Sequence, residues 1–131
     1  MRGADRQMAD FTVAILTSSD MAAQGEREDT SGDLAKELIE TNGGKVVARA
    51  VLPDEQEALA TQLRAWADSG EVGLILTTGG TGLGPRDVTP EATLDVAERL
   101  VPGLAEQMRA QTVAKTQMAM VSRQVVASRG G

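Results

Sequence analysis

Residues 77–92 read TTGGTGLGPRDVTPEA, with four glycines between Gly79 and Gly84. They directly follow VGLILTT at 72–78, a short apolar run that predicts a buried strand. Glycine loses more conformational entropy on folding than any other residue, so a cluster of four needs a reason. Bare N–H groups between a strand and a helix bind anions, and the helix dipole assists them. The stretch therefore predicts a strand, a phosphate-binding loop and a helix in succession.

The common phosphate-binding signatures fit this loop poorly. Gly79 and Gly84 have the spacing of a P-loop, but Pro85 and Arg86 stand where Lys and then Ser or Thr should follow. A dinucleotide-binding motif begun by the two middle glycines would need its last glycine where Pro85 stands. The simpler alternative is that the glycines only form a tight turn and that Arg86 and Asp87 are a solvated ion pair.

The helix after the loop has clear sequence signals. Thr89 is a suitable N-cap, Pro90 suits the first helical position, and Glu91 places negative charge in the first turn. We expect this helix to run to about Val101 and to be broken by Pro102 and the glycine after it.

Strands and helices alternate along the whole chain. The expected strands are 11–17, 45–52, 72–78 and 124–128. The expected helices are 31–42 with Thr30 or Ser31 as cap, the stretch from Pro53-Asp54 to near Gly70, 89–101 and 103–115. Apolar side chains at helical spacing predict buried faces formed by Leu34, Leu38 and Ile39, by Leu59, Leu63 and Trp66, and by core-filling Met108, Met118 and Met120.

This alternation predicts an α/β fold with a mostly parallel, helix-covered sheet. In such sheets ligands bind beyond the carboxyl ends of the strands. The candidate ligand-binding loops are therefore 18–29, 53–54 and 79–87.

The polar residues in these loops also have simpler explanations. Asp87 lies two residues before a helix N-cap, where a carboxylate stabilises the helix by itself. Asp54 with Glu57 resembles a capping box. Ser18 and Asp20 suit the beginning of an ordinary loop. The residues alone leave a structural and a functional role open for each of them.

The composition narrows the chemistry. A chain of 131 residues suits one domain, and the absence of His and Cys excludes disulfides, zinc sites built on thiolate or imidazole, thiol nucleophiles and a Ser–His pair. A net charge of -6, with one Trp and one Phe, argues against nucleic acid as a partner. No apolar run reaches the roughly 18 residues of a membrane span, and no secretory signal is visible. We therefore expect a cytoplasmic protein without a membrane partner.

Several segments together resemble one family. They are SSD at 18–20, DTSG at 29–32, PDE at 53–55, GGTGLGPRDVTPEAT at 79–93, GLAEQMR at 103–109 and SRQVV at 122–126. This set strongly resembles the molybdenum-cofactor biosynthesis family, which includes bacterial molybdopterin adenylyltransferases, their pterin-binding relatives and gephyrin-type domains. The resemblance divides the chain into a flexible N-terminus at 1–10 and a molybdopterin-binding domain at 11–131.

The resemblance implies both an architecture and a reaction. The fold would be a three-layer α/β/α arrangement, commonly assembled as a homotrimer. The enzyme would use Mg2+ and ATP to adenylylate the terminal phosphate of molybdopterin, with release of pyrophosphate. Its product would then be ready for metal insertion, which implies a molybdenum-insertion partner protein.

The resemblance also implies site residues. Those of the phosphate and pterin cradle are Thr78, Gly79, Gly80, Thr81 and Gly82. The functional acidic residues are Asp54 and Asp87. Further ligand-contacting positions are Ser18, Asp20, Ser31 and Ser122.

This chemistry is compatible with the residues present. A phosphate monoester is already an anionic nucleophile, so positioning and charge neutralisation suffice without a histidine base. Mg2+ needs only one or two carboxylates beside the substrate phosphates, which suits Asp87 with a second carboxylate from Asp54 or Asp20. Arg86 and Arg123 are candidates to offset charge on the transferring phosphoryl group.

Alternatives remain open at this stage. One is a non-catalytic molybdopterin-binding or trimeric scaffold protein of the same family, and another is a generic nucleotide-phosphate-binding α/β protein, which the absent P-loop lysine disfavours.

Family members continue past the last glycine pair into another strand, an Asn-Leu-Pro-Gly-Ser-like loop and a closing helix. We therefore expect 124–128 to have an unpaired edge, and the 131-residue form to be less stable and less active than a longer one.

Overall fold

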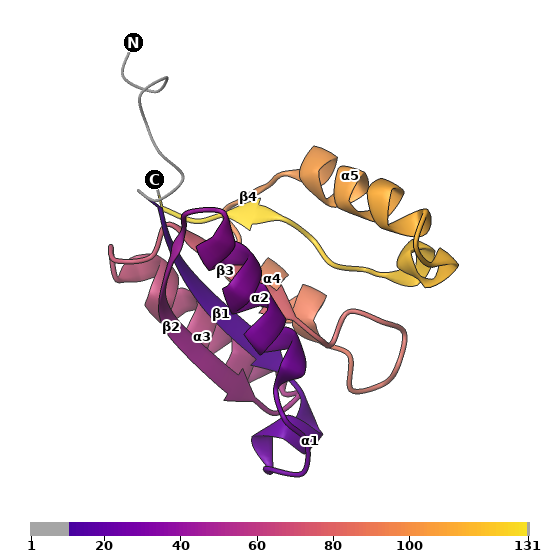
Figure 1. Ribbon diagram of the computed structural model, residues 1–131, viewed down its shortest axis with the longest axis horizontal. Helices are drawn as coiled ribbons and strands as arrows, with labels where there is room; N and C mark the ends of the chain where they lie inside the picture. Colours follow the sequence, from indigo (N-terminus) through magenta and orange to yellow (C-terminus); the bar gives the residue numbers. More distant parts are fainter. Residues whose placement is uncertain (1–10, 131) are drawn as a thin grey trace.

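A parallel three-stranded sheet forms the centre of the fold (Figure 1). The structure is a computed structural model that describes residues 11–130, so the predicted flexible terminus at 1–10 lies outside it. β1 (Thr12–Ser18) lies between β2 (Lys45–Leu52) and β3 (Leu74–Thr78), and both neighbours run parallel to it. The order β2-β1-β3 confirms the predicted α/β class.

Helices lie on both faces of this sheet, with α2 (Thr30–Thr41) on one face and α3 (Gln56–Asp68) and α4 (Thr89–Val96) on the other. The other helices are α1 (Asp20–Ala23), α5 (Pro102–Val113) and the 3-10 helix η3 (Gln117–Val121). β4 (Arg99–Leu100) and β5 (Ala127–Ser128) form a separate antiparallel pair. Within residues 11–130, none of these helices has the length and apolar character needed to cross a membrane.

β1 supplies the centre of the core to both layers of helices. All of its residues except Thr12 are buried, which explains its nearly continuous apolar sequence. Val13 and Ile15 pack with Ile39 of α2 on one face. Leu16 packs on the other face with buried residues of α3 and α4. A large apolar side chain buried in this way stabilises the fold by about 1.5 to 3 kcal/mol. The helices therefore enclose the sheet in three layers, as predicted.

The inward face of α2 differs from the predicted one. Ile39 is buried and Ala35 packs in the same cluster, with Gly32 buried one turn earlier. Leu34 and Leu38 are 57% and 55% exposed, so the predicted apolar face is wrong at these positions. Residues three and four apart share a helix face, and α2 turns the row that contains Gly32, Ala35 and Ile39 toward β1.

The predicted inward face of α3 is confirmed. Leu59 and Leu63 are buried, and half-buried Trp66 packs against the same core cluster. The helix ends at Asp68, shortly before Gly70, as the sequence predicts.

α4 begins where predicted but ends early. Thr89 is its first residue, and Val88 occupies the cap position without a side-chain hydrogen bond, so Thr89 is not the N-cap. Pro90 lies in the first turn, as predicted. After Val96 the backbone becomes extended at Ala97, because the following residues leave the helix to pair as β4 with β5.

The C-terminal part of the chain contacts the sheet less than predicted. The expected strand at 124–128 is reduced to β5, which pairs with β4 instead of the main sheet. Ala105 is the buried residue of α5, and this helix packs mainly against η3. Met108, Met118 and Met120 are 57%, 70% and 66% exposed, so their predicted core role is wrong. Figure 1 shows the reason, because α5 lies beside the three-stranded sheet and does not cover it.

Candidate functional site

The carboxyl ends of the three parallel strands meet at one edge of the sheet, which we call the carboxyl edge. Ser18 ends β1, Asp54 follows β2, and Gly79 directly follows β3. Because the strands are adjacent and parallel, the three loops predicted as ligand sites start side by side. In Figure 1 the carboxyl edge is the end of the sheet nearest α1.

The first two of these loops are joined by reciprocal hydrogen bonds. The Ser18 hydroxyl donates to Asp54 Oδ1, and the Asp20 backbone N–H donates to Asp54 Oδ2 at 3.2 Å. The Asp54 backbone N–H in turn donates to Asp20 Oδ1 at 2.9 Å. The cap position of α3 is held by Glu55 without a side-chain hydrogen bond, so the capping-box explanation of Asp54 is wrong. Two carboxylates are thus fixed next to each other, with backbone donors holding both.

Arg86 joins the glycine loop to this pair. Its Nε and Nη2 donate to the two oxygens of Asp20 at 3.0 and 2.8 Å. This bidentate bond, with the Asp54 backbone N–H as the second cause, lowers the pKa of Asp20. The same bond to Asp20 raises the pKa of Arg86. The carboxylate that pairs with Arg86 is therefore Asp20 and not the neighbouring Asp87, which excludes the Arg86–Asp87 pair of the simpler explanation. The Arg86 side chain remains 58% exposed and accessible to a ligand.

Gly79 and Gly80 pack directly against the end of β1. Their φ angles are +89° and +71°, in the left-handed region that favours glycine. A Cβ at Gly79 would meet the Ser18 carbonyl, and one at Gly80 would meet Thr89 Oγ1 and lie 3.2 Å from Ser18 Oγ. The Thr89 hydroxyl, 1% exposed as a residue, donates to the Gly79 carbonyl at 2.8 Å. Close packing and backbone conformation therefore both require glycine at these two positions. The sequence suggested Thr89 only as a helix cap and did not reveal that it supports the loop.

The second half of the loop closes over Asp87. The Gly84 N–H donates to Asp87 Oδ2 at 2.9 Å, and the Asp87 N–H donates to the Gly84 carbonyl at 3.0 Å. A Cβ at Gly82 or Gly84 would lie 3.0 Å from Asp87 Oδ2. The glycines here allow a close approach of backbone to carboxylate, without a left-handed φ. Asp87 is half-buried beneath the loop that it holds.

Arg123 reaches the same loop from the C-terminal part of the chain. Its backbone N–H donates to the Thr81 carbonyl at 2.9 Å, and its Nε donates to the Gly82 carbonyl at 2.8 Å. Nη2 donates to the Asp87 carbonyl at 2.8 Å, and Nη1 to Glu91 Oε2 at 2.6 Å. The hydrogen bond with Arg123 lowers the pKa of Glu91. Sequence reasoning missed this use of Glu91, because no local spacing links two residues 32 positions apart.

The neighbouring residues tie the same segment to β3. Ser122 is half-buried, and its carbonyl accepts a hydrogen bond from Arg109 Nη1 at 3.4 Å. Gln124 Nε2 donates to Thr77 Oγ1 at 3.0 Å. Thr78, at the end of β3, is half-buried just before the glycine loop. Arg123 is thus brought to the carboxyl edge, whereas Ser122 directly precedes it and has its own backbone bonded to α5 and η3.

α2 begins near this edge through Asp29. Thr17 Oγ1 donates to both Asp29 carboxylate oxygens at 3.0 Å, and the Gly32 N–H donates to Oδ1 at 3.0 Å. Asp29 is the N-cap of α2, so the predicted caps Thr30 and Ser31 are wrong. Ser31 is exposed on the first turn of the helix, beside the group of loops.

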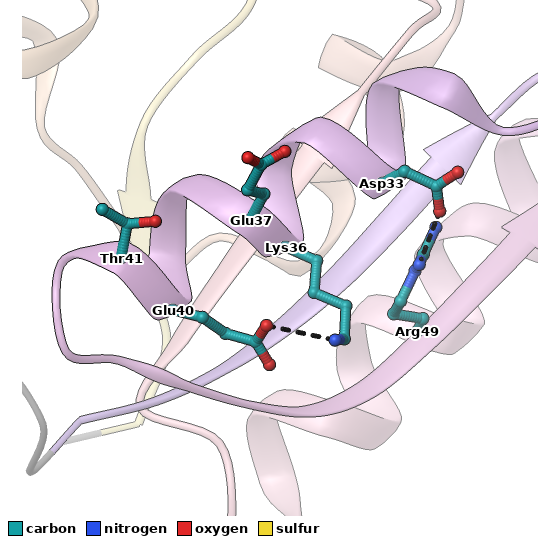
Figure 2. Close-up of a pocket in the computed structure, with 6 residues that line it drawn as sticks. All are labelled: Asp33, Lys36, Glu37, Glu40, Thr41 and Arg49. Atoms are coloured by element: carbon teal, nitrogen blue, oxygen red, sulfur yellow. Dashed lines mark hydrogen bonds and ion pairs between the residues drawn. The ribbon is translucent and has the colours of Figure 1, made fainter.

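A hollow of the described surface lies elsewhere, on α2 and β2 (Figure 2). This groove, which we call the α2 groove, has a volume of about 440 Å³. It is lined by Asp33, Lys36, Glu37, Glu40, Thr41 and Arg49. None of the predicted site residues lines it, so the candidate site is defined by the convergence of loops and not by this groove.

Fold and site together define an α/β domain with charged loops at the carboxyl edge of a parallel sheet. The family described as the probable molybdopterin binding domain matches residues 14–130, and the chain belongs to this family. The matched range contains the glycine loop, Asp54 and Asp87, so the family resemblance of these motifs is confirmed.

Several similar proteins are named for molybdenum cofactor or molybdopterin synthesis. The chain is 42% identical over 117 residues to the Drosophila melanogaster protein named molybdenum cofactor synthesis protein cinnamon, covering 88% of the chain and 20% of that protein. It is 33% identical over 119 residues to a molybdopterin adenylyltransferase of Helicobacter pylori J99, covering 89% and 68%. The structure of the molybdopterin biosynthesis enzyme MoaB of Thermus thermophilus superposes with a TM-score of 0.85 at 48% identity, covering 92% and 76%. The chain spans 20% to 36% of the first curated relatives that it matches.

Proposed function

We propose that this chain is a molybdopterin adenylyltransferase, acting in molybdenum cofactor biosynthesis with Mg2+ and ATP. The observation that supports it most is the convergence at the carboxyl edge of a bare-backbone loop, Arg86 and the carboxylates Asp20, Asp54 and Asp87. An adenylyl transfer needs this combination, because it joins two polyanionic substrates and moves charge between them.

The reaction requires no protonic base on the protein. An oxygen of the terminal phosphate of molybdopterin forms a bond to the α-phosphorus of ATP. The bond from that phosphorus to the bridging oxygen of the β-phosphate breaks, and pyrophosphate leaves with the bond electrons. A phosphate monoester is largely a dianion at neutral pH because its second pKa is about 6, so the nucleophile is already ionised. The task of the protein is to align the two phosphates and to reduce their repulsion.

A Mg2+ ion at this site would be held jointly by protein carboxylates and substrate phosphates. Among residues 11–130 there is no group of three or more acidic side chains placed to hold a metal ion by itself. Mg2+ is commonly bound by one or two carboxylates together with substrate phosphates, and Asp87 with Asp54 or Asp20 supplies such a set. Bound there, the ion would neutralise charge on the phosphates of ATP.

The remaining residues have binding and positioning roles in this proposal. Gly79, Gly80 and Gly82 carry no side chain, and in this proposal the N–H groups of their loop are the donors that a phosphate or the pterin approaches. Arg86, bidentate to Asp20 and largely exposed, provides a positive charge that the ligand can share. The hydroxyl groups of Ser18 and Thr78, with Ser31 and Ser122 at the margin, are candidate polar contacts.

Release of pyrophosphate tests the proposal. We expect the 131-residue chain to release pyrophosphate from Mg-ATP only when molybdopterin is present, and to lose this activity when Mg2+ is chelated. Binding of both molybdopterin and ATP in titration calorimetry without release would show a binding protein and overturn the catalytic proposal. Failure to bind molybdopterin would overturn the substrate assignment itself.

A further inference from the structure

Arg123 faces the glycine loop and Glu91, in contrast to exposed Arg86. A guanidinium has five N–H donors. Arg123 Nε donates to the Gly82 carbonyl. Arg123 Nη2 donates to the Asp87 carbonyl and also, at 3.4 Å, to Glu91 Oε1. Nη1 donates to Glu91 at 2.6 Å. At most one N–H is left for a ligand, so Arg123 cannot present a two-pronged donor to a phosphate without breaking these bonds.

The two loop carbonyls that the Arg123 guanidinium contacts are five residues apart. They belong to Gly82 and Asp87, and they flank the segment that contains Gly84 and Arg86. Because both bond to one rigid planar group, Arg123 fixes the distance between the two ends of the segment. The Arg123 backbone N–H adds a third bond, to Thr81.

Glu91 completes the arrangement from the first turn of α4. Its carboxylate balances the charge of Arg123 and orients the guanidinium, whose side chain is 34% exposed. The charge of Arg123 is therefore already matched by a protein carboxylate.

We propose that Arg123 and Glu91 are positioning residues, a clamp that holds loop 82–87 in the shape that places Asp87 and Arg86 for the phosphate groups of the substrates. The part that concerns the substrates rests on the function proposed above, whereas the effect on the shape of the loop does not. Arg123 thereby acts through the loop and not by direct contact with the transferring group.

The structure offers a matched set of variants. Glu91→Gln removes the charge that orients the guanidinium, and Arg123→Gln removes the guanidinium itself, so each weakens the clamp. The double variant tests whether the two residues act as one unit. Arg123→Lys keeps the positive charge but loses the planar fork. Arg129→Gln is the control, because Arg129 belongs to the same C-terminal part of the chain but bonds to Asp68 and the Val96 carbonyl, away from the loop.

The transfer reaction separates a clamp from a phosphate ligand. We expect Glu91→Gln and Arg123→Gln each to lower kcat about 10- to 100-fold, as small misplacements of reacting groups do. The double variant should be no worse than the more impaired single variant, because residues in one network are not additive. Arg123→Lys should not restore the rate, and Arg129→Gln should retain it. A Glu91→Gln protein with unchanged kcat and equal or tighter binding of Mg-ATP would overturn the proposal, because it would show that Glu91 only competes with the ligand for Arg123.

A measurement without ligand tests the clamp if the chain has no transferase activity. The amide proton of Gly84 reports its hydrogen bond to Asp87, and its NMR signal should shift or broaden in Glu91→Gln and in Arg123→Gln. The signal should stay in place in Arg129→Gln. If Arg123→Gln does not fold, Glu91→Gln still decides, because its carboxylate is 40% exposed. A Gly84 signal unchanged in Glu91→Gln would overturn the clamp, whatever the fate of the proposed function.

Discussion

The carboxyl edge and the α2 groove both contain paired charges, but they differ in what holds those charges. In the groove, Lys36 pairs with Glu40 at 3.1 Å along one helix, and both side chains are nearly half exposed, at 44% and 49%. Exposed pairs of this kind contribute roughly 0 to 1 kcal/mol and have little geometric constraint. At the carboxyl edge, by contrast, carboxylates accept bonds from backbone N–H groups and from buried Ser18, which is 5% exposed.

This difference indicates that concavity alone does not identify the site. Side chains at the end of flexible stems move with solvent, whereas backbone donors at the ends of buried strands are fixed by the fold. A site that must align two phosphates needs the second kind of support. Substitutions at the carboxyl edge should therefore affect function far more than matched substitutions in the α2 groove.

The strongest contrast is between two Asp→Asn substitutions. Asp87→Asn should lower adenylyl transfer at least ~100-fold, because it removes a charge at the site while an amide oxygen can still accept from the Gly84 N–H. Asp33→Asn in the groove should leave the rate unchanged. Pyrophosphate release gives the rates, and thermal unfolding checks that both proteins fold. Equal rates for the two variants would remove the distinction between the regions.

Two glycines with similar backbone conformations separate strain from contact. Gly80 and Gly70 have φ values of +71° and +78°, but an added Cβ meets Thr89 only at Gly80 and has nothing within 4 Å at Gly70. Gly70→Ala should lose roughly 1 to 2 kcal/mol of stability from the left-handed backbone alone. Gly80→Ala should lose more stability than Gly70→Ala, because its added Cβ also meets Thr89. It should bind Mg-ATP at least about tenfold more weakly, as the loss of one good polar contact would cause. Denaturant unfolding and titration calorimetry measure the two effects, and equal behaviour would contradict close packing below the loop.

The bond between Arg86 and Asp20 should have a smaller effect. Asp20→Asn removes the charge that holds Arg86 in two hydrogen bonds, so the cation becomes mobile. We expect about a tenfold fall in transfer, within the range for loss of a charge-assisted hydrogen bond. Lys36→Gln breaks an ion pair of the groove and is the matched control. Unchanged kinetics in Asp20→Asn would show that Arg86 needs no anchor.

The same ion pairs predict a dependence on pH. Arg86 lowers the pKa of Asp20, and Arg123 lowers that of Glu91, relative to their ordinary values. A carboxylate with a lowered folded-state pKa stabilises the protein fully above its unfolded pKa of roughly 4, and this contribution is lost as pH falls through the folded-state pKa. Both pairs should therefore remain intact at about pH 5, above the ordinary carboxyl range. Carbon NMR titration of the carboxyl groups measures the two pKa values. Arg86→Gln should raise the pKa of Asp20, because it removes the bond that lowers it. A midpoint unmoved by Arg86→Gln would show that the pair does not persist in solution.

The smallest effect is expected in the groove itself. Lys36→Ala should change stability by less than about 0.5 kcal/mol, as for most surface substitutions, because the pair that it breaks is exposed. Transfer should be unaffected. A large loss of transfer activity would instead place a functional site in the α2 groove.

Local sequence patterns predicted most of the elements, because their determinants are local. The apolar run of β1, the spacing of Leu59 and Leu63, and Pro90 in the first turn of α4 depend on burial and on backbone preferences a few residues apart. The inward face of α2 was wrong because Leu34 and Leu38 satisfy the same helical period as the row that faces β1. Periodicity identifies a stripe, and tertiary packing then decides between neighbouring stripes.

The details of the site depended on contacts that no local pattern contains. The loop signature placed Asp87 and Arg86 at the carboxyl edge, but not the partner of either. Arg86 pairs with a residue 66 positions away, and Arg123 with one 32 positions away. Composition could not reveal that the Arg123 guanidinium bonds to loop carbonyls and not to a ligand. That depends on where the fold places the C-terminal segment relative to the loop.

The long separations within the site also affect how the protein acquires its function. Ser18 meets Asp54 across 36 positions, Arg123 meets Gly82 across 41, and Arg86 meets Asp20 across 66. Contacts of this kind form only after large loops have closed, so a partly folded chain has no binding site. A ligand of the carboxyl edge should therefore bind the native state alone and raise its stability by mass action, by about 2.7 kcal/mol at a concentration one hundred times its Kd. In such a protein the melting temperature itself becomes an assay for substrates, because a molecule that binds the assembled site increases it.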